Sequence, residues 1–310
     1  MIKSKLDNFE SFVKRLTKKY DPHTNVIGLG RSILAVGTLL TLLSNPSHYL
    51  FNKSVEGVYF NPLLNTDEFT INKLNFFLLF GPDYAYIMQI LGILILIVVI
   101  SGYFIKVTSV LHWWIAASFM LSSSLLDGGD QIAAIMSLLL IPICITDTRK
   151  NHWEVSEKRE SASNILAIMA VWLIRIQVAI IYLDAATGKF PVTEWANGTA
   201  LYYWLNHSVF GIQSGFTPLL NPILSNKFLE PVLTYSVLIL ELLLFTSIFA
   251  SVRFRKRMLP FAIGFHFFII IFHGIFSFFF SIVCGLVLYL YPTYHDLKFK
   301  ALALKFKKVL

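Results

Sequence analysis

Charged residues are scarce in this chain of 310 residues, because Asp, Glu, Lys and Arg together make up only 14% of it. A soluble protein of this length carries about a quarter of such residues. Hydrophobic residues account for 56%, and several apolar runs approach the ~20 residues with which a helix crosses a ~30 Å hydrocarbon core. The composition excludes an ordinary soluble domain and predicts a multi-pass protein of the cell membrane.

Cysteine is also rare, and the familiar motifs of soluble enzymes are missing. The two cysteines, Cys144 and Cys284, each lie inside an apolar segment, where we expect small core residues rather than a disulfide or a metal pair. No phosphate-binding loop, zinc-protease motif, nucleophile elbow or dinucleotide fingerprint occurs. The first 25 residues lack an apolar core followed by a cleavage site, so we expect no removable signal peptide.

Eight apolar segments are long enough to be candidate spans. Backbone groups in lipid must form their hydrogen bonds within their own segment, so we expect every span to be a helix and the fold to be all-α. Short polar, Gly-containing or Pro-containing stretches separate these segments. The expected spans are residues 26–44, 84–105, 108–126, 129–146, 163–187, 231–250, 258–274 and 276–293.

The basic residues behind the net charge of +8 are distributed as the predicted topology requires, and they do not indicate a nucleic-acid-binding surface. With the N-terminus in the cytoplasm, twenty of the 26 Lys and Arg residues fall on the cytoplasmic side and four fall outside. Such a bias sets the orientation of membrane proteins. It predicts cytoplasmic termini, no nucleic-acid partner, and three parts: an N-terminal segment 1–25, a membrane domain 26–293 and a basic tail 294–310.

Two ionisable residues lie near the middle of expected spans. Arg175 is in the fifth span and Glu241 in the sixth, and at ~1.5 Å per residue they fall at similar depth. A charge in lipid is expensive and is a functional candidate by default. We expect a structural ion pair between Arg175 and Glu241 that clamps the two helices together.

Polar residues also gather at the expected outer face. "DGGD" contains Asp127 and Asp130, and its glycines, Gly128 and Gly129, are expected to adopt positive φ in a tight turn. One interpretation is that the aspartates only cap the fourth span. The other is that they act chemically together with His273, which ends the seventh span at the same face.

Lys189, just beyond the fifth span, is the further catalytic candidate. A lysine in an apolar, water-poor pocket can act as a base, whereas a lysine at a helix end can also simply reach the interface. His266 and His273 are seven residues apart, ~10 Å along a helix, which is too far to share one metal ion. We therefore expect no metal site.

The exterior segment 188–230 is rich in aromatic residues. Trp195, Tyr202 and Trp204 are the candidate substrate-binding residues in it, because large aromatic side chains anchor peptides at binding surfaces. A peptide lying against this segment would be held by these rings.

The stretch "WLIRIQVAIIYLDAATGKF", followed by "EWANGTALYYW", resembles the membrane (HTTM) domain of the vitamin K-dependent carboxylase superfamily. The resemblance implies an eight-helix membrane domain with Lys189 as the base that deprotonates a quinone-like lipid. "DGGD" replaces the Asn-His pair of that branch, and no large lumenal domain follows, so glutamate carboxylation is not expected. The matching positions are Arg175, Gln177, Tyr182, Lys189, Trp195 and Gly198.

The short eight-span layout with "GGD" before the fourth span also resembles the sporulation-delaying protein B (SdpB) family. This resemblance implies a membrane factor that works with a small partner protein to mature a secreted toxin precursor into an antimicrobial peptide. Two alternatives stay open. One is an HTTM-type enzyme that uses a quinone-like lipid cofactor, and the other is a transporter or immunity protein that binds the toxin without chemistry.

Overall fold

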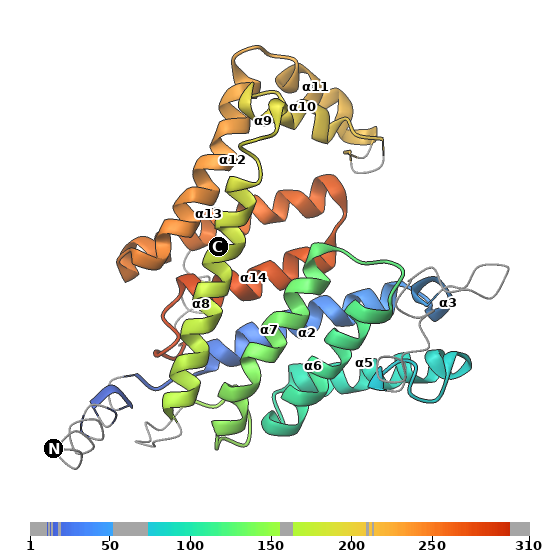
Figure 1. The fold of residues 1–310 in the computed structure, drawn as a ribbon, viewed down its shortest axis with the longest axis vertical. Helices are drawn as coiled ribbons and strands as arrows, with labels where there is room; N and C mark the ends of the chain where they lie inside the picture. The colour runs from blue at the N-terminus through green and yellow to red at the C-terminus, as the bar shows by residue number, and fades with distance from the viewer. Residues whose placement is uncertain are drawn as a thin grey trace, which may run out of the picture.

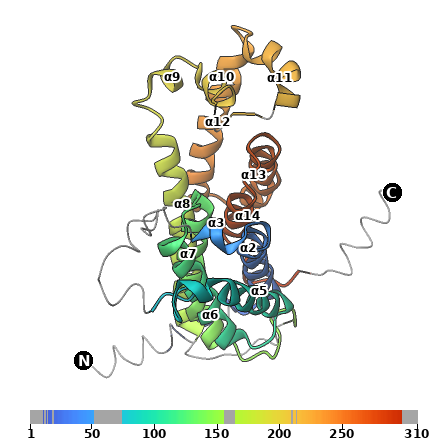
Figure 2. The same ribbon diagram turned by 90° about the vertical axis from the view of Figure 1, so that its right-hand side faces the viewer.

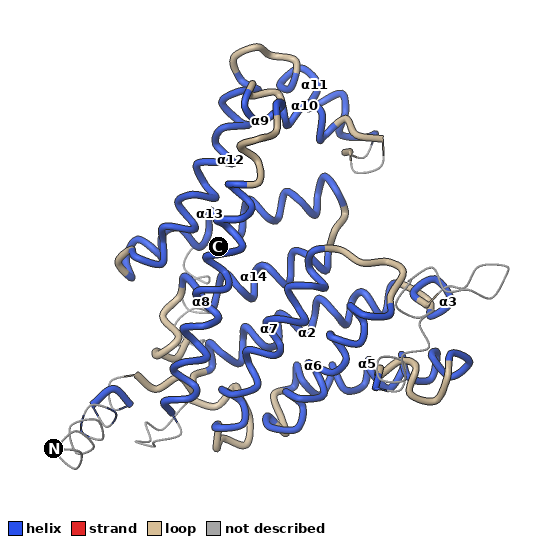
Figure 3. Tube along the Cα trace, viewed as in Figure 1, coloured by secondary structure: helices blue, strands red, loops and turns tan. Residues whose placement is uncertain are grey.

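The regular elements in the described part of the chain are helices joined by loops (Figure 3). The β-type contact within it is a single bridge between Tyr103 and Asn151. The predicted all-α fold is therefore confirmed there. Most of the predicted N-terminal segment and basic tail lies outside the described residues. The structure, a computed structural model, describes residues 11–297 with the exception of 12, 14, 18–19, 52–73, 156–163, 209–210 and 213.

A helix lies over each of the expected spans. The main difference is at the seventh, which begins six residues earlier than expected, so that the basic sequence "RFRKR" is helical; the side chain of Ser251 caps this helix by accepting from the backbone N–H of Phe254. The helices are α2 (Asn25–Ser44), α5 (Ala85–Ser101), α6 (Ile105–Ser122), α7 (Gly128–Thr146), α8 (Asn164–Thr187), α12 (Leu229–Thr246), α13 (Val252–His273) and α14 (Phe276–Leu290).

Five helical segments are long and apolar enough to cross a membrane: α2, α7, α8, α13, and α12 with its extension η4 (Ser247–Phe249). The apolar helices α5 and α14 are shorter. These findings identify a membrane-type protein, while the count of eight spans stays a prediction. Helix α14 lies in the middle of the bundle, against α2, α7, α8 and α13 (Figures 1 and 2). Every residue from Ser281 to Leu290 is therefore buried.

Helices α8 and α12 lie side by side but are offset along their length (Figure 1). The first turns of α12 extend beyond the end of α8 and carry the short helices α9 (Thr193–Ala196), α10 (Ala200–Leu205) and α11 (Thr217–Leu224). Tyr235 on α12 donates its hydroxyl hydrogen to the carbonyl oxygen of Ala196 at 2.8 Å. The aromatic exterior segment is thus a folded cap on α12.

Successive long helices alternate in direction, so their connections gather at two ends. At one end Thr24 donates to the carbonyl of Thr293 at 2.7 Å, and Asn151 donates to the carbonyl of Ser101 at 3.0 Å. We call this the inner end, after the predicted topology. The other, outer end joins the end of α2, the start of α7 and the turn between α13 and α14.

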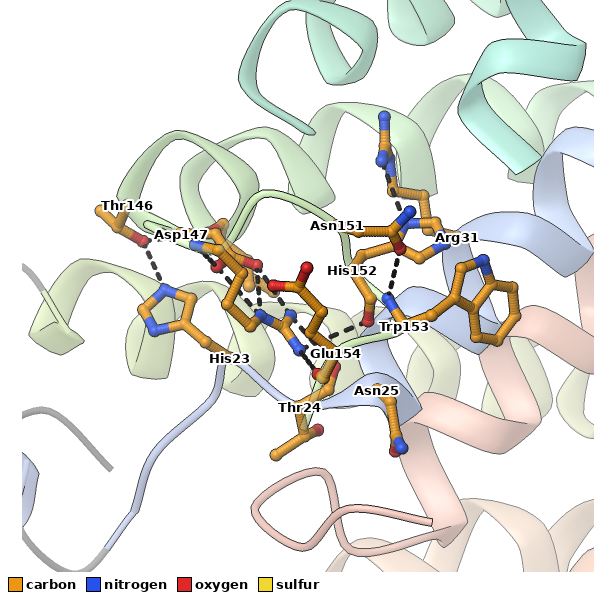
Figure 4. A network of polar contacts seen from close by, with 12 residues as sticks. His23, Thr24, Asn25, Arg31, Thr146, Asp147, Asn151, His152, Trp153 and Glu154 are labelled. Carbon is orange, nitrogen blue, oxygen red and sulfur yellow. Dashed lines mark hydrogen bonds and ion pairs between the residues drawn. The ribbon is translucent and has the colours of Figure 1, made fainter. Parts of the chain in front are cut away.

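The loop after α7 is fastened to α2 by a buried polar network (Figure 4). The ring of His152 lies between the Arg31 guanidinium, at 3.1 Å, and the Ser32 hydroxyl, at 3.2 Å. Burial and the positive charges of Arg31 and Arg149 lower the pKa of His152 to about 3. Arg149 is paired with Asp147 at 2.7 Å. The network therefore holds a neutral imidazole at neutral pH.

Candidate functional site

Lys189 follows the end of α8 and folds back along its last turn. Its ammonium nitrogen donates to the carbonyl oxygen of Ala185 at 2.8 Å and to both carboxylate oxygens of Glu241, at 2.7 and 2.9 Å. The indole ring of Trp195 lies against the ammonium, with its centroid 5.2 Å away. The lysine is thus held between α8 and α12 by a carboxylate and an aromatic face.

The predicted ion pair between Arg175 and Glu241 does not form. Glu241 pairs with Lys189 instead, and Arg175 donates to the Thr293 hydroxyl at 3.4 Å and lies over the Trp172 ring at the inner end. Counting residues along each expected span placed Arg175 and Glu241 at a similar depth in the membrane. Because α12 begins beyond the end of α8, Glu241 is level with the last turn of α8 rather than with Arg175.

A cavity of about 600 Å³ opens beside the Lys189–Glu241 pair, between α8, α10–α13 and α14. Most of its wall is aliphatic or aromatic. Trp195 and Trp204 of the predicted substrate-binding residues line it, whereas Tyr202 is not among the lining residues and packs its ring against Tyr203. The polar residues in the wall are Tyr182, Lys189, Ser236, Glu241, His266 and His273.

The hydroxyl group of Tyr182 has no hydrogen-bond partner within the described residues, although the side chain is buried. Its ring lies against that of His266, with centroids 6.0 Å apart. Nδ1 of His266 is 2.8 Å from the carbonyl oxygen of Ala262. A carbonyl oxygen only accepts, so Nδ1 donates, and Nε2 of the neutral ring is an acceptor. The wall therefore holds a free hydroxyl beside an imidazole.

The aspartates of "DGGD" line a second cavity of about 590 Å³ at the outer end. Asp127 caps α7: its carboxylate accepts from the backbone N–H of Gly129 and of Asp130, and Asp130 accepts in return from the backbone N–H of Asp127. The hydroxyl of Ser277 also donates to Asp127. That the aspartates cap the fourth span is thus confirmed, and a catalytic role for them stays a prediction.

His273 lines both cavities and lies between the two sets of predicted catalytic residues. Asp127 and Asp130 are on one side of it, and Lys189 is on the other. The structure thus does not bring the four predicted catalytic residues into one cluster.

The two glycines of "DGGD" are helical, and neither has a positive φ, contrary to expectation. Gly129 is required for a different reason. A Cβ atom there would run into the backbone of Ser277 and Phe278 at the start of α14. At Gly128 a Cβ atom would meet only the Phe278 ring, at an ordinary 3.7 Å. The glycine therefore allows α7 to touch α14.

Metal ligands are not clustered in the described residues, where no group of three or more His, Cys, Asp or Glu side chains is placed to hold an ion. Cys144 and Cys284 are both buried and unpaired, as expected for core residues.

Sequence reasoning missed the partnership of Glu241 with Lys189 and the place of His266 beside Tyr182. The motif that contains Tyr182 had singled out that residue. The pairing of Glu241 with Lys189 and the position of His266 depend on helix offsets that no local pattern encodes.

Two proteins of Bacillus subtilis (strain 168) are similar to this chain over nearly its whole length. The sporulation-delaying protein SdpB is 34% identical over 283 residues, which cover 90% of this chain and 84% of SdpB. The uncharacterized protein YitO is 33% identical over 299 residues, covering 95% of this chain and 94% of YitO. No family model and no solved structure matches the chain.

Proposed function

The chain belongs to the family of the sporulation-delaying protein SdpB, and from this membership we propose that it is the plasma-membrane factor that matures a secreted antimicrobial peptide. The peptide precursor and a small partner protein of the same system are its proposed partners. The work is done at the outer face, with both termini in the cytoplasm. The cavity beside Lys189 is the proposed site.

The contact between the partly buried Lys189 and the buried Glu241, in the wall of an apolar cavity, carries this proposal. The carboxylate oxygen 2.7 Å from the ammonium nitrogen can accept its proton, which leaves a neutral amine and a neutral acid. The neutral amine is a general base within reach of a group bound in the cavity.

The aromatic cap supplies the surface on which a peptide would lie. Trp204 is half exposed and Trp195 is buried, so one ring faces outward while the other supports Lys189. Aromatic side chains give a peptide large apolar contacts together with a polar edge. An apolar segment of the precursor would enter the cavity between these rings and α13.

The test measures the secreted peptide, by mass and by killing activity, from cells that carry variants at matched membrane levels. Lys189→Arg keeps a cation but is effectively always protonated, and we expect it to release only unprocessed precursor, as does Lys189→Ala. Lys227→Ala removes another lysine on the predicted outer side, in an exposed position, and is the matched control. Normal peptide from Lys189→Arg would rule out a base at this position.

The apolar wall of the cavity also favours one alternative, an enzyme that uses a quinone-like lipid. That function requires a lipid-soluble ring compound to co-purify with the protein and to be lost when the cavity is filled, as in Ser236→Phe. The transporter alternative depended on a central Arg175–Glu241 pair. It loses this support because the pair does not form.

A further inference from the structure

A third cavity, of about 490 Å³, lies at the inner end and contains two arginines. Arg175 comes from α8 and Arg255 from the first turn of α13, and both line the cavity together with Thr293 and Tyr294 of the segment that follows α14. Arg175 is 6% exposed and Arg255 is 9% exposed. Two guanidinium groups are therefore buried together, about 14 residues along α8 from the Lys189 site, or ~21 Å.

Neither arginine has a carboxylate partner among the described residues. Arg175 donates to the hydroxyl oxygen of Thr293, and Arg255 donates to the carbonyl oxygen of Tyr289, each at a long 3.4 Å. Nε of both side chains is buried without a hydrogen-bond partner in the described part of the chain, and the two positive charges repel each other. A buried charge without compensation costs several kcal/mol, so this arrangement calls for an anion between the guanidinium groups.

The rest of the cavity wall has the character of a lipid site. Aliphatic residues of the first turns of α8 line the cavity, together with three aromatic residues, Tyr20, Trp172 and Tyr294. Tyr and Trp are enriched at the membrane–water boundary. The wall thus combines two guanidinium groups with apolar side chains, which matches a molecule with an anionic head and a hydrocarbon tail. The aliphatic residues are Ile165, Ile168, Met169 and Val171.

We propose that this cavity binds an anionic phospholipid, with its phosphate between Arg175 and Arg255. Planar guanidinium groups bind phosphate oxygens through paired, charge-assisted hydrogen bonds. Basic pockets between helices on the cytoplasmic side hold anionic headgroups in this way. The inner end is the cytoplasmic side in the predicted topology. The bound lipid supplies the missing counter-charge and fixes α13 against α8.

The first experiment measures lipid retention by the full-length protein with native mass spectrometry. Wild type in detergent is given phosphatidylglycerol or phosphatidylcholine, and we expect one phosphatidylglycerol per chain to be retained at least tenfold more strongly. Arg175→Gln and Arg255→Gln should lose this preference. Arg253→Gln removes an exposed arginine two positions along the same helix and should keep it. Equal retention by Arg253→Gln and Arg255→Gln would overturn the site.

The second experiment separates binding from a folding defect. A ligand stabilises the native state that binds it, so phosphatidylglycerol should raise the midpoint of thermal unfolding of wild type and of Arg253→Gln. It should leave the midpoint of Arg255→Gln unchanged. In phosphatidylcholine alone, Arg255→Gln should unfold at or above the wild-type temperature, because a repulsive buried charge has been removed.

A lower midpoint for Arg255→Gln in phosphatidylcholine would show that the arginine is satisfied within the protein, and the proposal would fail. Inorganic phosphate serves as the further probe. If millimolar phosphate raised the midpoint as much as phosphatidylglycerol, the site would bind a free anion, and the lipid assignment would be wrong.

Discussion

The ammonium nitrogen of Lys189 lies 2.7 and 2.9 Å from the two carboxylate oxygens of Glu241, so a residue just past the end of α8 is tied to the middle of α12. The side chains are 22% and 8% exposed. One contact therefore joins the two offset helices and places a proton donor and a proton acceptor at the wall of the cavity.

Removing one partner of this pair should destabilise the protein more than removing both. Lys189→Met leaves the buried carboxylate of Glu241 uncompensated, which costs about 3 kcal/mol of unfolding free energy. In Lys189→Met with Glu241→Gln no charge is left, and we expect most of the loss to be recovered. Thermal unfolding of the single and the double variant in one detergent, followed by tryptophan fluorescence, measures the two losses of stability. Additive losses in the double variant would mean that the two residues do not stabilise each other.

Neighbouring glycines in "DGGD" should respond in opposite ways to alanine. Gly129→Ala drives a Cβ atom into the backbone of Ser277 and Phe278, and such overpacking costs about 1–3 kcal/mol. Gly128→Ala meets only the Phe278 ring at 3.7 Å, so it should be neutral or stabilise slightly through reduced backbone freedom in the unfolded chain. The midpoints of thermal unfolding of the two variants, compared at equal expression, test this prediction. Equal midpoints would show that α7 and α14 separate without cost.

The helices were predictable from the sequence because membrane-length apolar runs are a local property of the chain. The cap at Asp127 was predictable for the same reason, since an aspartate three residues before another aspartate at a helix start satisfies backbone donors locally. These features need no knowledge of how the helices pack.

The partners of charged residues could not be predicted in this way. The pairing of Glu241 with Lys189, rather than with Arg175, depends on the offset between α8 and α12. Gly129 was correctly singled out but for the wrong reason, because its requirement comes from the approach of α14, a helix about 150 residues further along the chain. Both outcomes depend on long-range packing.

Acid should destabilise the inner end through His152. The pKa of this imidazole is lowered to about 3 by burial and by Arg31 and Arg149, while an unfolded histidine titrates near 6.5. Below pH 6.5 the unfolded chain therefore binds a proton that the native state does not, and stability falls as pH falls from about 6.5 towards 3. At pH 5 this amounts to about 2 kcal/mol.

The contribution of His152 is read from a comparison of variants. His152→Gln should lose stability at neutral pH but show a flatter decline between pH 7 and pH 4 in thermal unfolding. His48→Gln removes an exposed histidine four residues beyond the end of α2 and should follow the wild-type curve. If the stability of His152→Gln declined with falling pH as steeply as that of wild type, groups other than His152 would cause the acid sensitivity.

Tyr182→Phe should separate stability from function. The Tyr182 hydroxyl is buried at the wall of the cavity without a partner in the described residues, and a buried hydroxyl left unsatisfied costs about 1–3 kcal/mol. Removing it should leave the ligand-free protein as stable as wild type or more stable, by up to about 1 kcal/mol.

If the cavity receives the polar end of a substrate, the same variant should yield less mature peptide at equal membrane levels. Tyr235→Phe, which breaks a hydrogen bond to Ala196, is the control that should lose stability instead. A Tyr182→Phe variant with unchanged stability and unchanged peptide would show that this hydroxyl takes no part in binding, and the polar contact would then fall to His266 and Glu241.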